Sequence, residues 1–125
     1  MAVVGIGTDL ARIERFRKFL QPDNKVLERI FSEDERSYAL AMKDPAPHLA
    51  ARFAAKEAFL KALGTGLRDG LSWQQVLVVR DQLGCPSLQL SGRAAEMLAE
   101  RNVCSTHLSY SHDGDYAVAT VVLES

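Results

Sequence analysis

The sequence has few cysteines, no long apolar run and almost no net charge. Cys85 and Cys104 are the only cysteines and lack a Cys-x-x-Cys spacing, so we interpret both as reduced thiols without a structural role. No apolar run approaches the roughly 20 residues that a membrane-spanning helix needs, which predicts a soluble protein. The formal net charge of −1 argues against a nucleic-acid-binding protein that is held by its overall field.

The first residues do not show the pattern of a signal peptide, and no linker-like stretch divides the sequence. Met1 to Gly7 contain neither a basic start nor a long apolar stretch, and we therefore expect a cytoplasmic protein that does not associate with a membrane. No repeat or low-complexity tract divides the 125 residues, which predicts a single domain over residues 1–125. A domain of this size is short for an enclosed active site, which favours a site shared between subunits.

Hydrophobic periodicity and turn signals predict an α+β fold with a mostly antiparallel sheet. We expect helices from a turn at 7–9 to about residue 20, and over 25–31, 32–42, 48–63 and 91–101, and strands over 3–6, 75–80, 87–90, 106–112 and 116–123. Ser32 and Glu35 have the spacing of a capping box. Gly64 supplies a C-terminal helix stop, and Asp113-Gly114 favours a tight hairpin turn. The prolines at 45 and 47 are expected to end the third helix.

The helix predicted over 48–63 contains a lysine where an apolar residue is expected. At 100° per residue, Leu49, Phe53 and Leu60 share one stripe, and Lys56 lies inside it. Burying a charge is costly unless the charge meets a partner. Lys56 must therefore either extend to water or line a cavity that holds an anion.

Glu57 and Lys61 lie on the flank of the same stripe, one helical turn apart. Taken alone, they are read most simply as an exposed ion pair that contributes roughly 0.2–0.5 kcal/mol. Together with Arg52 and Lys56, however, Lys61 forms a cationic edge around the Glu57 carboxylate. This combination is suited to a phosphate ligand that is held partly through a metal.

The segment Gly5-Ile6-Gly7-Thr8-Asp9 superficially resembles a phosphate-binding loop. Leu10 stands where a dinucleotide-binding fingerprint needs its third glycine, and Asp9 would repel a phosphate at a helix N-terminus. On local grounds Asp9 is read as a helix cap. If Asp9 and Glu57 meet in space, their carboxylates and the oxygens of a diphosphate would form an oxygen-only site for Mg²⁺.

The segment 107–113 holds serine, histidine and aspartate but does not predict a hydrolase. Neighbours on a strand point to opposite faces, so Ser111, His112 and Asp113 cannot form a triad, and no Gly-x-Ser-x-Gly motif is present. Ser109 and Ser111 share one face and could donate hydrogen bonds to an anion.

Residues 12–18 are rich in basic side chains, which indicates either a solvated helix face or a docking surface for an acidic partner.

Three segments together closely resemble the holo-acyl-carrier-protein synthases, the small phosphopantetheinyl transferases of bacterial fatty acid synthesis. They are the Gly-x-Asp run 5–9, the run 52–66 with its Lys-Glu-x-x-x-Lys pattern, and Ser109 to His112 before Tyr116. The resemblance implies a 4'-phosphopantetheinyl transferase-like fold, with the sheet packed against a long central helix. It also implies transfer of 4'-phosphopantetheine from coenzyme A to a serine of apo-acyl carrier protein, with release of 3',5'-ADP.

The resemblance further implies roles for individual residues. Asp9 and Glu57 would bind Mg²⁺ together with the diphosphate of coenzyme A and, with Lys61, would be catalytic. Lys56 and Lys61 would contact phosphates, and Lys61 would also protonate or neutralise the departing 3',5'-ADP. Glu57 or a metal-bound water would take the serine proton.

The remaining predicted contacts lie around the coenzyme and its protein partner. The predicted coenzyme contacts outside the catalytic set are Arg52, Gly84, Pro86, Ser111 and His112. Arg15 matches a basic residue that receives the acidic recognition helix of the carrier protein. The family forms homotrimers with sites between adjacent subunits, which agrees with the size of the chain.

One departure from the family pattern and two other functions complete these predictions. Where some relatives carry a basic cluster that reaches the 3'-phosphate, residues 43–47 keep only Lys43 as a basic residue. The same acidic and cationic groups would also serve a metal-dependent phosphohydrolase of nucleotides. A coenzyme A or nucleotide sensor without turnover is the non-enzymatic alternative.

Overall fold

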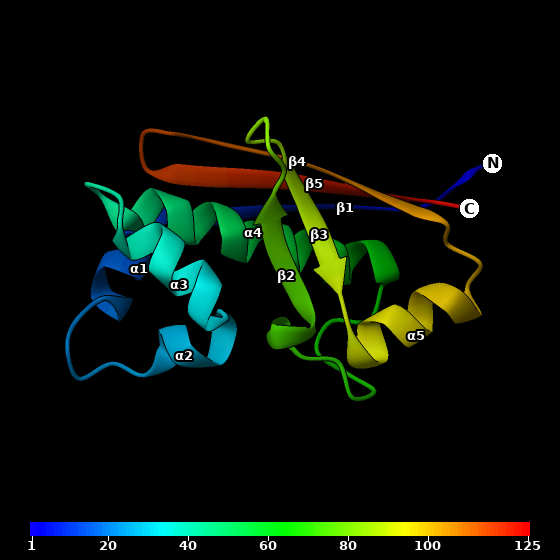
Figure 1. Cartoon of the computed structure of the whole chain (residues 1–125), viewed down its shortest axis with the longest axis horizontal. Helices are drawn as coiled ribbons and strands as arrows, with labels where there is room; N and C mark the ends of the chain where they lie inside the picture. The colour runs from blue at the N-terminus through cyan, green and yellow to red at the C-terminus, as the bar shows by residue number, and fades with distance from the viewer.

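Helix α4 (Pro45–Leu63) crosses the middle of the molecule, and the other elements are arranged around it (Figure 1). The computed structural model describes all residues, 1–125. Alanine, leucine and charged long-chain residues give this segment a high helix propensity. The elements in chain order are β1 (Val3–Arg12), α1 (Ile13–Phe19), α2 (Val26–Ile30), α3 (Glu33–Leu40), α4, the 3-10 turn η1 (Trp73–Gln75), β2 (Val76–Arg80), β3 (Pro86–Leu90), α5 (Gly92–Glu100), β4 (Ser105–Asp113) and β5 (Tyr116–Glu124).

A three-stranded antiparallel sheet in the order β1-β5-β4 covers one side of α4. The residues of β5 alternate along the strand, and Ala117, Ala119, Val121 and Leu123 are buried in the core. The chain ends lie together beside this sheet (Figure 1), and Ser125 N donates to Ala2 O at 2.8 Å. The last strand in the sequence is therefore the central strand of the sheet.

Two glycines let β1 lie directly on α4. A Cβ atom at Gly7 would collide with the backbone oxygen of Ala58, and one at Gly5 would collide with the backbone oxygen of Ala62. Gly5, Gly7 and Asp9 alternate along the strand and so share one face of it. This close contact directs the Asp9 side chain toward α4.

Strand β1 is longer than the sequence predicted. A strand over 3–6 followed by a helix was expected, but the strand continues to Arg12 and α1 begins at Ile13. The reason is long-range pairing, because β1 runs antiparallel to β5 from Val3 opposite Glu124 to Arg12 opposite Tyr116. Reading Asp9 as a helix cap is therefore wrong.

The start of α4 also differs from the prediction. Pro45 and Pro47 were expected to end the preceding helix, but α3 already ends at Leu40 and Pro45 is the first residue of α4. Proline fits there because the first turn of a helix has no intrahelical partner for its N–H groups. The predicted end is confirmed, since Gly64 adopts a left-handed φ of 78°.

The remaining elements confirm the predicted fold class. Strands β2 and β3 form a second antiparallel sheet, and β4 and β5 form the predicted hairpin around Gly114. The capping box of Ser32 and Glu35 is present at the start of α3. The chain is an α+β protein with a long central helix. None of its helices has both the length and the apolar character needed to cross a membrane.

Candidate functional site

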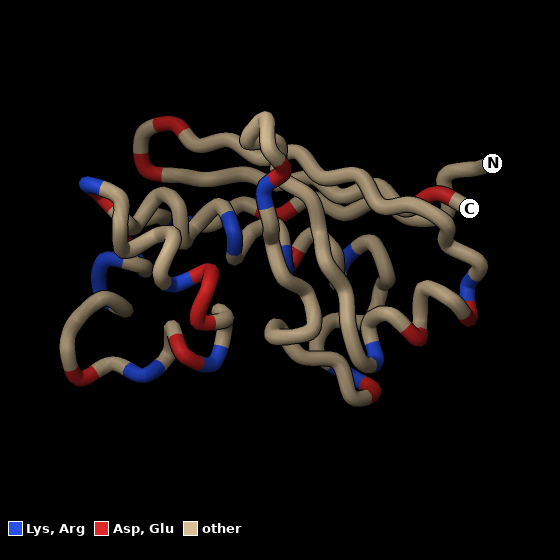
Figure 2. The backbone as a smooth tube through the Cα atoms, viewed as in Figure 1, with Lys and Arg blue, Asp and Glu red and all other residues tan.

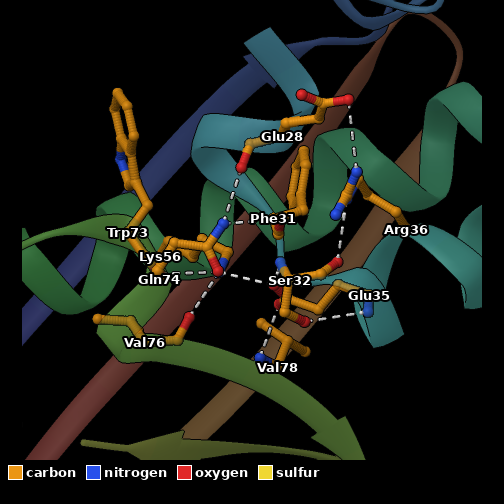
Figure 3. A network of polar contacts seen from close by, with 10 residues as sticks. All are labelled: Glu28, Phe31, Ser32, Glu35, Arg36, Lys56, Trp73, Gln74, Val76 and Val78. Atoms are coloured by element: carbon orange, nitrogen blue, oxygen red, sulfur yellow. Dashed lines mark hydrogen bonds and ion pairs between the residues drawn. The ribbon is translucent and has the colours of Figure 1, made fainter. Parts of the chain in front are cut away.

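Lys56 is completely buried and bound by three oxygen atoms of the protein (Figure 3). Its Nζ donates to Glu35 Oε1 at 2.9 Å, to the Trp73 carbonyl at 2.9 Å and to the Val76 carbonyl at 2.7 Å. An ammonium group has three hydrogens, so this set uses all of them. The geometry speaks against the predicted phosphate contact of Lys56, which neither reaches water nor lines a ligand cavity.

Glu35 is the charged partner that makes this burial feasible. Besides Lys56, its carboxylate accepts from Ser32 N at the start of α3 and from Val78 N in β2. Burial lowers the pKa of the Lys56 ammonium, and the charge and hydrogen bond of Glu35 oppose that shift. The sequence did not reveal this pair, because Glu35 was explained by the capping box alone.

Asp9 and Lys61 form an ion pair between β1 and α4. Lys61 Nζ donates to Asp9 Oδ1 at 2.9 Å and to the Thr8 carbonyl at 3.1 Å. The Asp9 side chain is 15% exposed, and that of Lys61 is 54% exposed. The pairing differs from the ion pair of Lys61 with Glu57 that local helix geometry suggested. It places a half-exposed cation beside a largely buried carboxylate.

Glu57 lies one turn before Lys61 on the same side of α4 and makes a different contact. Its Oε1 accepts a hydrogen bond from Trp73 Nε1 at 2.8 Å, and it pairs with no lysine or arginine. Lys61 thus links Asp9 on the strand to the side of the helix that carries Glu57. The three residues predicted to be catalytic occupy one region of the molecule.

Asp9 and Glu57 suit a hard divalent cation but are too few to enclose one. No group of three or more histidine, cysteine, aspartate or glutamate side chains could hold a metal ion. Mg²⁺ prefers six oxygen ligands and commonly keeps water and substrate phosphates among them. Two carboxylates fit such a site when a diphosphate supplies further oxygens.

Arg52 is the second buried cation of α4, and it has no carboxylate partner. The residue is 2% exposed, and its Nη1 donates to the His48 carbonyl at 3.3 Å. Its Nε has no hydrogen-bond partner. The guanidinium lies 4.3 Å from the centre of the Tyr38 ring. A buried guanidinium with an unused donor is prepared to receive an anion.

Arg80 joins Arg52 at the same tyrosine. Arg80 Nη1 donates to Tyr38 Oη at 2.7 Å, and its guanidinium lies 5.4 Å from the ring centre. The turn that follows Arg80 contains Gly84, whose φ of 82° favours glycine, and Pro86 pairs with Arg80 in the antiparallel register. The two predicted coenzyme contacts Gly84 and Pro86 therefore lie beside this pair of arginines.

His112 reaches the same cluster from the sheet. Its ring centre is 6.2 Å from that of His48, which is 6.2 Å from the Tyr38 ring. Burial lowers the pKa of His48, and the positive charges of Arg52 and Arg80 lower it further. Ser111 neighbours His112 in β4 and therefore points to the opposite face, away from α4.

A pocket of about 300 Å³ opens next to these side chains. It lies between α3 and the sheet of β2 and β3, and both arginines contribute to its wall. Its lining residues are Ser32, Asp34, Glu35, Tyr38, Arg52, Leu77, Val78, Val79, Arg80 and Gln89. Sequence reasoning found Arg52 but missed Tyr38, His48 and Arg80, because nothing local to those residues distinguishes them from ordinary surface positions.

Lysine and arginine residues are spread over many parts of the trace (Figure 2), and Arg15 is an exposed one on α1. Its guanidinium lies 5.5 Å from the centre of the Phe53 ring, which is 6.0 Å from the Trp73 ring. Arg17 is bound to Glu14 and Asp44, whereas Arg15 has no carboxylate partner. Arg15 is thus the α1 cation nearest to this aromatic group and remains available to a ligand.

Comparison with known proteins gives consistent matches over nearly the whole chain. Residues 5–121 match the family ACPS, the 4'-phosphopantetheinyl transferase superfamily. The chain is 60% identical over 121 residues to the holo-[acyl-carrier-protein] synthase of Syntrophotalea carbinolica. The matched region covers 96% of this chain and 94% of that protein. It is 54% identical over 124 residues to the corresponding protein of Trichlorobacter lovleyi, with 98% of both chains covered.

Solved structures agree with the sequence matches. The holo-[acyl-carrier-protein] synthase of Neisseria meningitidis superposes with a TM-score of 0.87 at 35% identity, covering 99% of this chain and 100% of the other. The synthase of Bacillus anthracis, solved in complex with CoA (3',5'-ADP), gives a TM-score of 0.81 at 40% identity, covering 98% and 97%. These matches confirm the resemblance seen in the motifs, and the chain belongs to the holo-[acyl-carrier-protein] synthase family of 4'-phosphopantetheinyl transferases.

Proposed function

We propose that this protein transfers the 4'-phosphopantetheine group of coenzyme A to a serine hydroxyl of an apo-acyl carrier protein and releases 3',5'-ADP, as a step of fatty acid biosynthesis. The observation that carries this proposal is membership of the family over residues 5–121, together with the conjunction of Asp9, Lys61 and Glu57 beside α4. A relative of the same fold was solved with CoA (3',5'-ADP).

Asp9 and Glu57 would hold Mg²⁺ in this reaction. When bound, the ion neutralises the diphosphate and so lowers the cost of placing it beside two carboxylates. Lys61 is half-exposed and can leave Asp9 to follow a phosphate, because a phosphate oxygen offers its ammonium group an anion in place of the carboxylate. This makes Lys61, rather than the buried Lys56, the lysine that contacts phosphate.

The transfer itself requires alignment and charge neutralisation. The serine oxygen forms a bond to the β-phosphorus of coenzyme A, and the bond from that phosphorus to the oxygen of 3',5'-ADP breaks. Glu57 or a water molecule accepts the serine proton. Lys61 neutralises the charge on the departing 3',5'-ADP or donates a proton to it.

The cluster around Tyr38 would bind the nucleotide end of coenzyme A. Arg52 and Arg80 supply two positive charges at the wall of the pocket, and Arg52 keeps a buried donor without a partner. The turn with Gly84 and Pro86 lies beside them, and His112 approaches from β4. Arg80 would supply positive charge in a chain whose segment 43–47 retains only Lys43.

A homotrimer with sites between subunits would explain the position of Ser111. The outer face of the sheet carries the exposed apolar side chains Ile6 and Leu10, which are 65% and 60% exposed. Ser111 pairs with Val118 on the strand next to Leu10, so it belongs to this outer face. A coenzyme contact by Ser111 would then be made from a neighbouring subunit.

An acidic carrier protein would dock on α1 through Arg15.

The decisive experiment is incubation of the protein with coenzyme A, Mg²⁺ and an apo-carrier protein, followed by mass spectrometry of the carrier. We expect the mass of the carrier to rise by one phosphopantetheine group, and a chelator should prevent the change. Phosphopantetheine released without any carrier modification would instead favour a phosphohydrolase. Saturable binding of coenzyme A without any product would favour a sensor.

Substitution of the two carboxylates tests the metal site. Asp9→Ala and Glu57→Ala should each abolish Mg²⁺-dependent transfer, whereas Asp23→Ala, which removes an exposed carboxylate without a hydrogen bond, should retain the normal rate. Circular dichroism spectra should be equal in all three variants. Near-normal transfer by Asp9→Ala and Glu57→Ala would remove both residues from the mechanism.

A further inference from the structure

We propose that Trp73 is a positioning residue that fixes the carboxylate of Glu57 for metal binding, and that the buried Lys56 in turn fixes Trp73. This inference rests on the role proposed above for Glu57. Trp73 is the single tryptophan of the chain. It lies in η1, outside the motifs by which the family was recognised in the sequence.

The geometry forms a closed ring of contacts between neighbouring residues. Lys56 Nζ donates to the Trp73 carbonyl at 2.9 Å, and Trp73 Nε1 donates to Glu57 Oε1 at 2.8 Å. Lys56 and Glu57 are consecutive on α4, so the ring closes through the helix backbone. Lys56 thus fixes the backbone of Trp73, and the side chain of Trp73 fixes Glu57.

The Lys56 end of this ring is rigid. Lys56 is completely buried, and its two other hydrogen bonds go to Glu35 and to the Val76 carbonyl (Figure 3). The Trp73 indole also lies 6.0 Å from the Phe53 ring, centre to centre, which restricts its rotation. The indole N–H is therefore directed by contacts that do not depend on a ligand.

A neutral donor is well suited to hold a metal ligand. The indole N–H occupies Oε1 of Glu57 without adding a positive charge, so the carboxylate keeps its full charge for a cation. No hydrogen bond within the protein is made to Oε2, which remains available. Asp9 differs, because its charge is already matched by Lys61. Donors that orient a metal-binding carboxylate commonly change metal affinity when they are removed.

The test compares Trp73→Phe, which keeps an aromatic ring but removes the donor, with the wild type. We expect the Mg²⁺ concentration for half-maximal transfer to rise about tenfold, whereas the KM for the carrier protein should change little. Tyr110→Phe is the matched control, because it removes a buried hydroxyl that makes no hydrogen bond. An unchanged Mg²⁺ requirement in Trp73→Phe would overturn the proposal.

Two further measurements separate positioning from packing. Replacement of Trp73 by benzothienylalanine, which has the shape of tryptophan but no N–H group, should reproduce the higher Mg²⁺ requirement even if Trp73→Phe folds poorly.

In the wild type, addition of Mg²⁺ and coenzyme A should alter the fluorescence of Trp73. Glu57→Gln should remove the part of this fluorescence change that depends on Mg²⁺. If the wild type transfers the group but its fluorescence does not respond to Mg²⁺, the positioning role fails and the proposed function stands. If the wild type transfers nothing, the proposed function itself fails.

Discussion

Two buried cations of this protein, Lys56 and Arg52, are stabilised in different ways. Lys56 is matched by Glu35 and two backbone carbonyls, whereas Arg52 lies over Tyr38 with its Nε unpartnered. A matched charge stabilises a defined arrangement of α3, α4 and β2. An unmatched one remains ready for a ligand. This difference indicates a structural role for Lys56 and supports the proposed coenzyme contact of Arg52.

Removal of the Lys56 ammonium should destabilise the fold strongly. Lys56→Met leaves the Glu35 carboxylate buried without its cation, which costs about 3–5 kcal/mol of unfolding free energy. The double variant with Glu35→Gln should be more stable than Lys56→Met, because glutamine carries no charge and can still accept a hydrogen bond. Urea unfolding of both variants measures this, and equal stabilities would contradict the pairing.

His48 should make the stability of the protein sensitive to acid. Its pKa in the folded state lies below the ordinary 6.5, so between those two values the unfolded chain binds more protons than the folded chain. The contribution of His48 is fully present above pH 6.5 and is lost as the pH falls through the lower, folded pKa. In His48→Phe the decline of the melting temperature below pH 6.5 should be shallower, and parallel curves for the two proteins would disprove the effect.

At the scale of secondary structure, the contact of β1 with α4 positions the proposed metal site. Gly7→Ala places a methyl group against the Ala58 backbone, which cannot yield as a flexible side chain could. We expect a loss of about 1–3 kcal/mol in stability and a large loss of transfer, since the strand that carries Asp9 must move outward. Thr8→Ala on the exposed face of the same strand is the control. Unfolding by denaturant and the rate of carrier modification are the two measurements.

Elements whose boundaries depend on nearby residues were predictable from the sequence. Ser32 and Glu35 predicted the start of α3, and Gly64 predicted the end of α4. The Asp113-Gly114 pair predicted the hairpin. Strand β1 was predicted too short because its second half is defined by pairing with β5, more than a hundred residues away. The pairs Lys56 with Glu35 and Glu57 with Trp73 were missed for the same reason.

At the scale of the whole molecule, one face of the three-stranded sheet remains uncovered. Helix α4 packs on the inner face, whereas Ile6 and Leu10 stand on the outer face beside Val122 and Val118 of β5. Apolar side chains gathered in this way on an open sheet commonly mark a contact between proteins. This face is the surface on which the proposed homotrimer would assemble.

A charge on that face should disrupt the assembly. Ile6→Asp is expected to shift the mass measured by light scattering from a trimer to a monomer, and to reduce transfer if the sites lie between subunits. Leu40→Asp changes another exposed apolar residue, on α3, and should preserve the trimer. A wild-type protein that is already monomeric at micromolar concentration would contradict the proposed assembly.

The central position of β5 has a consequence for biosynthesis. Because β5 lies between β1 and β4, neither of those strands has a partner in this sheet until β5 has been synthesised and is free to pair. Until then the apolar side of α4 that β5 covers stays open to solvent. A nascent chain that lacks β5 can therefore form its helices and pair β2 with β3, but it cannot assemble the three-stranded sheet.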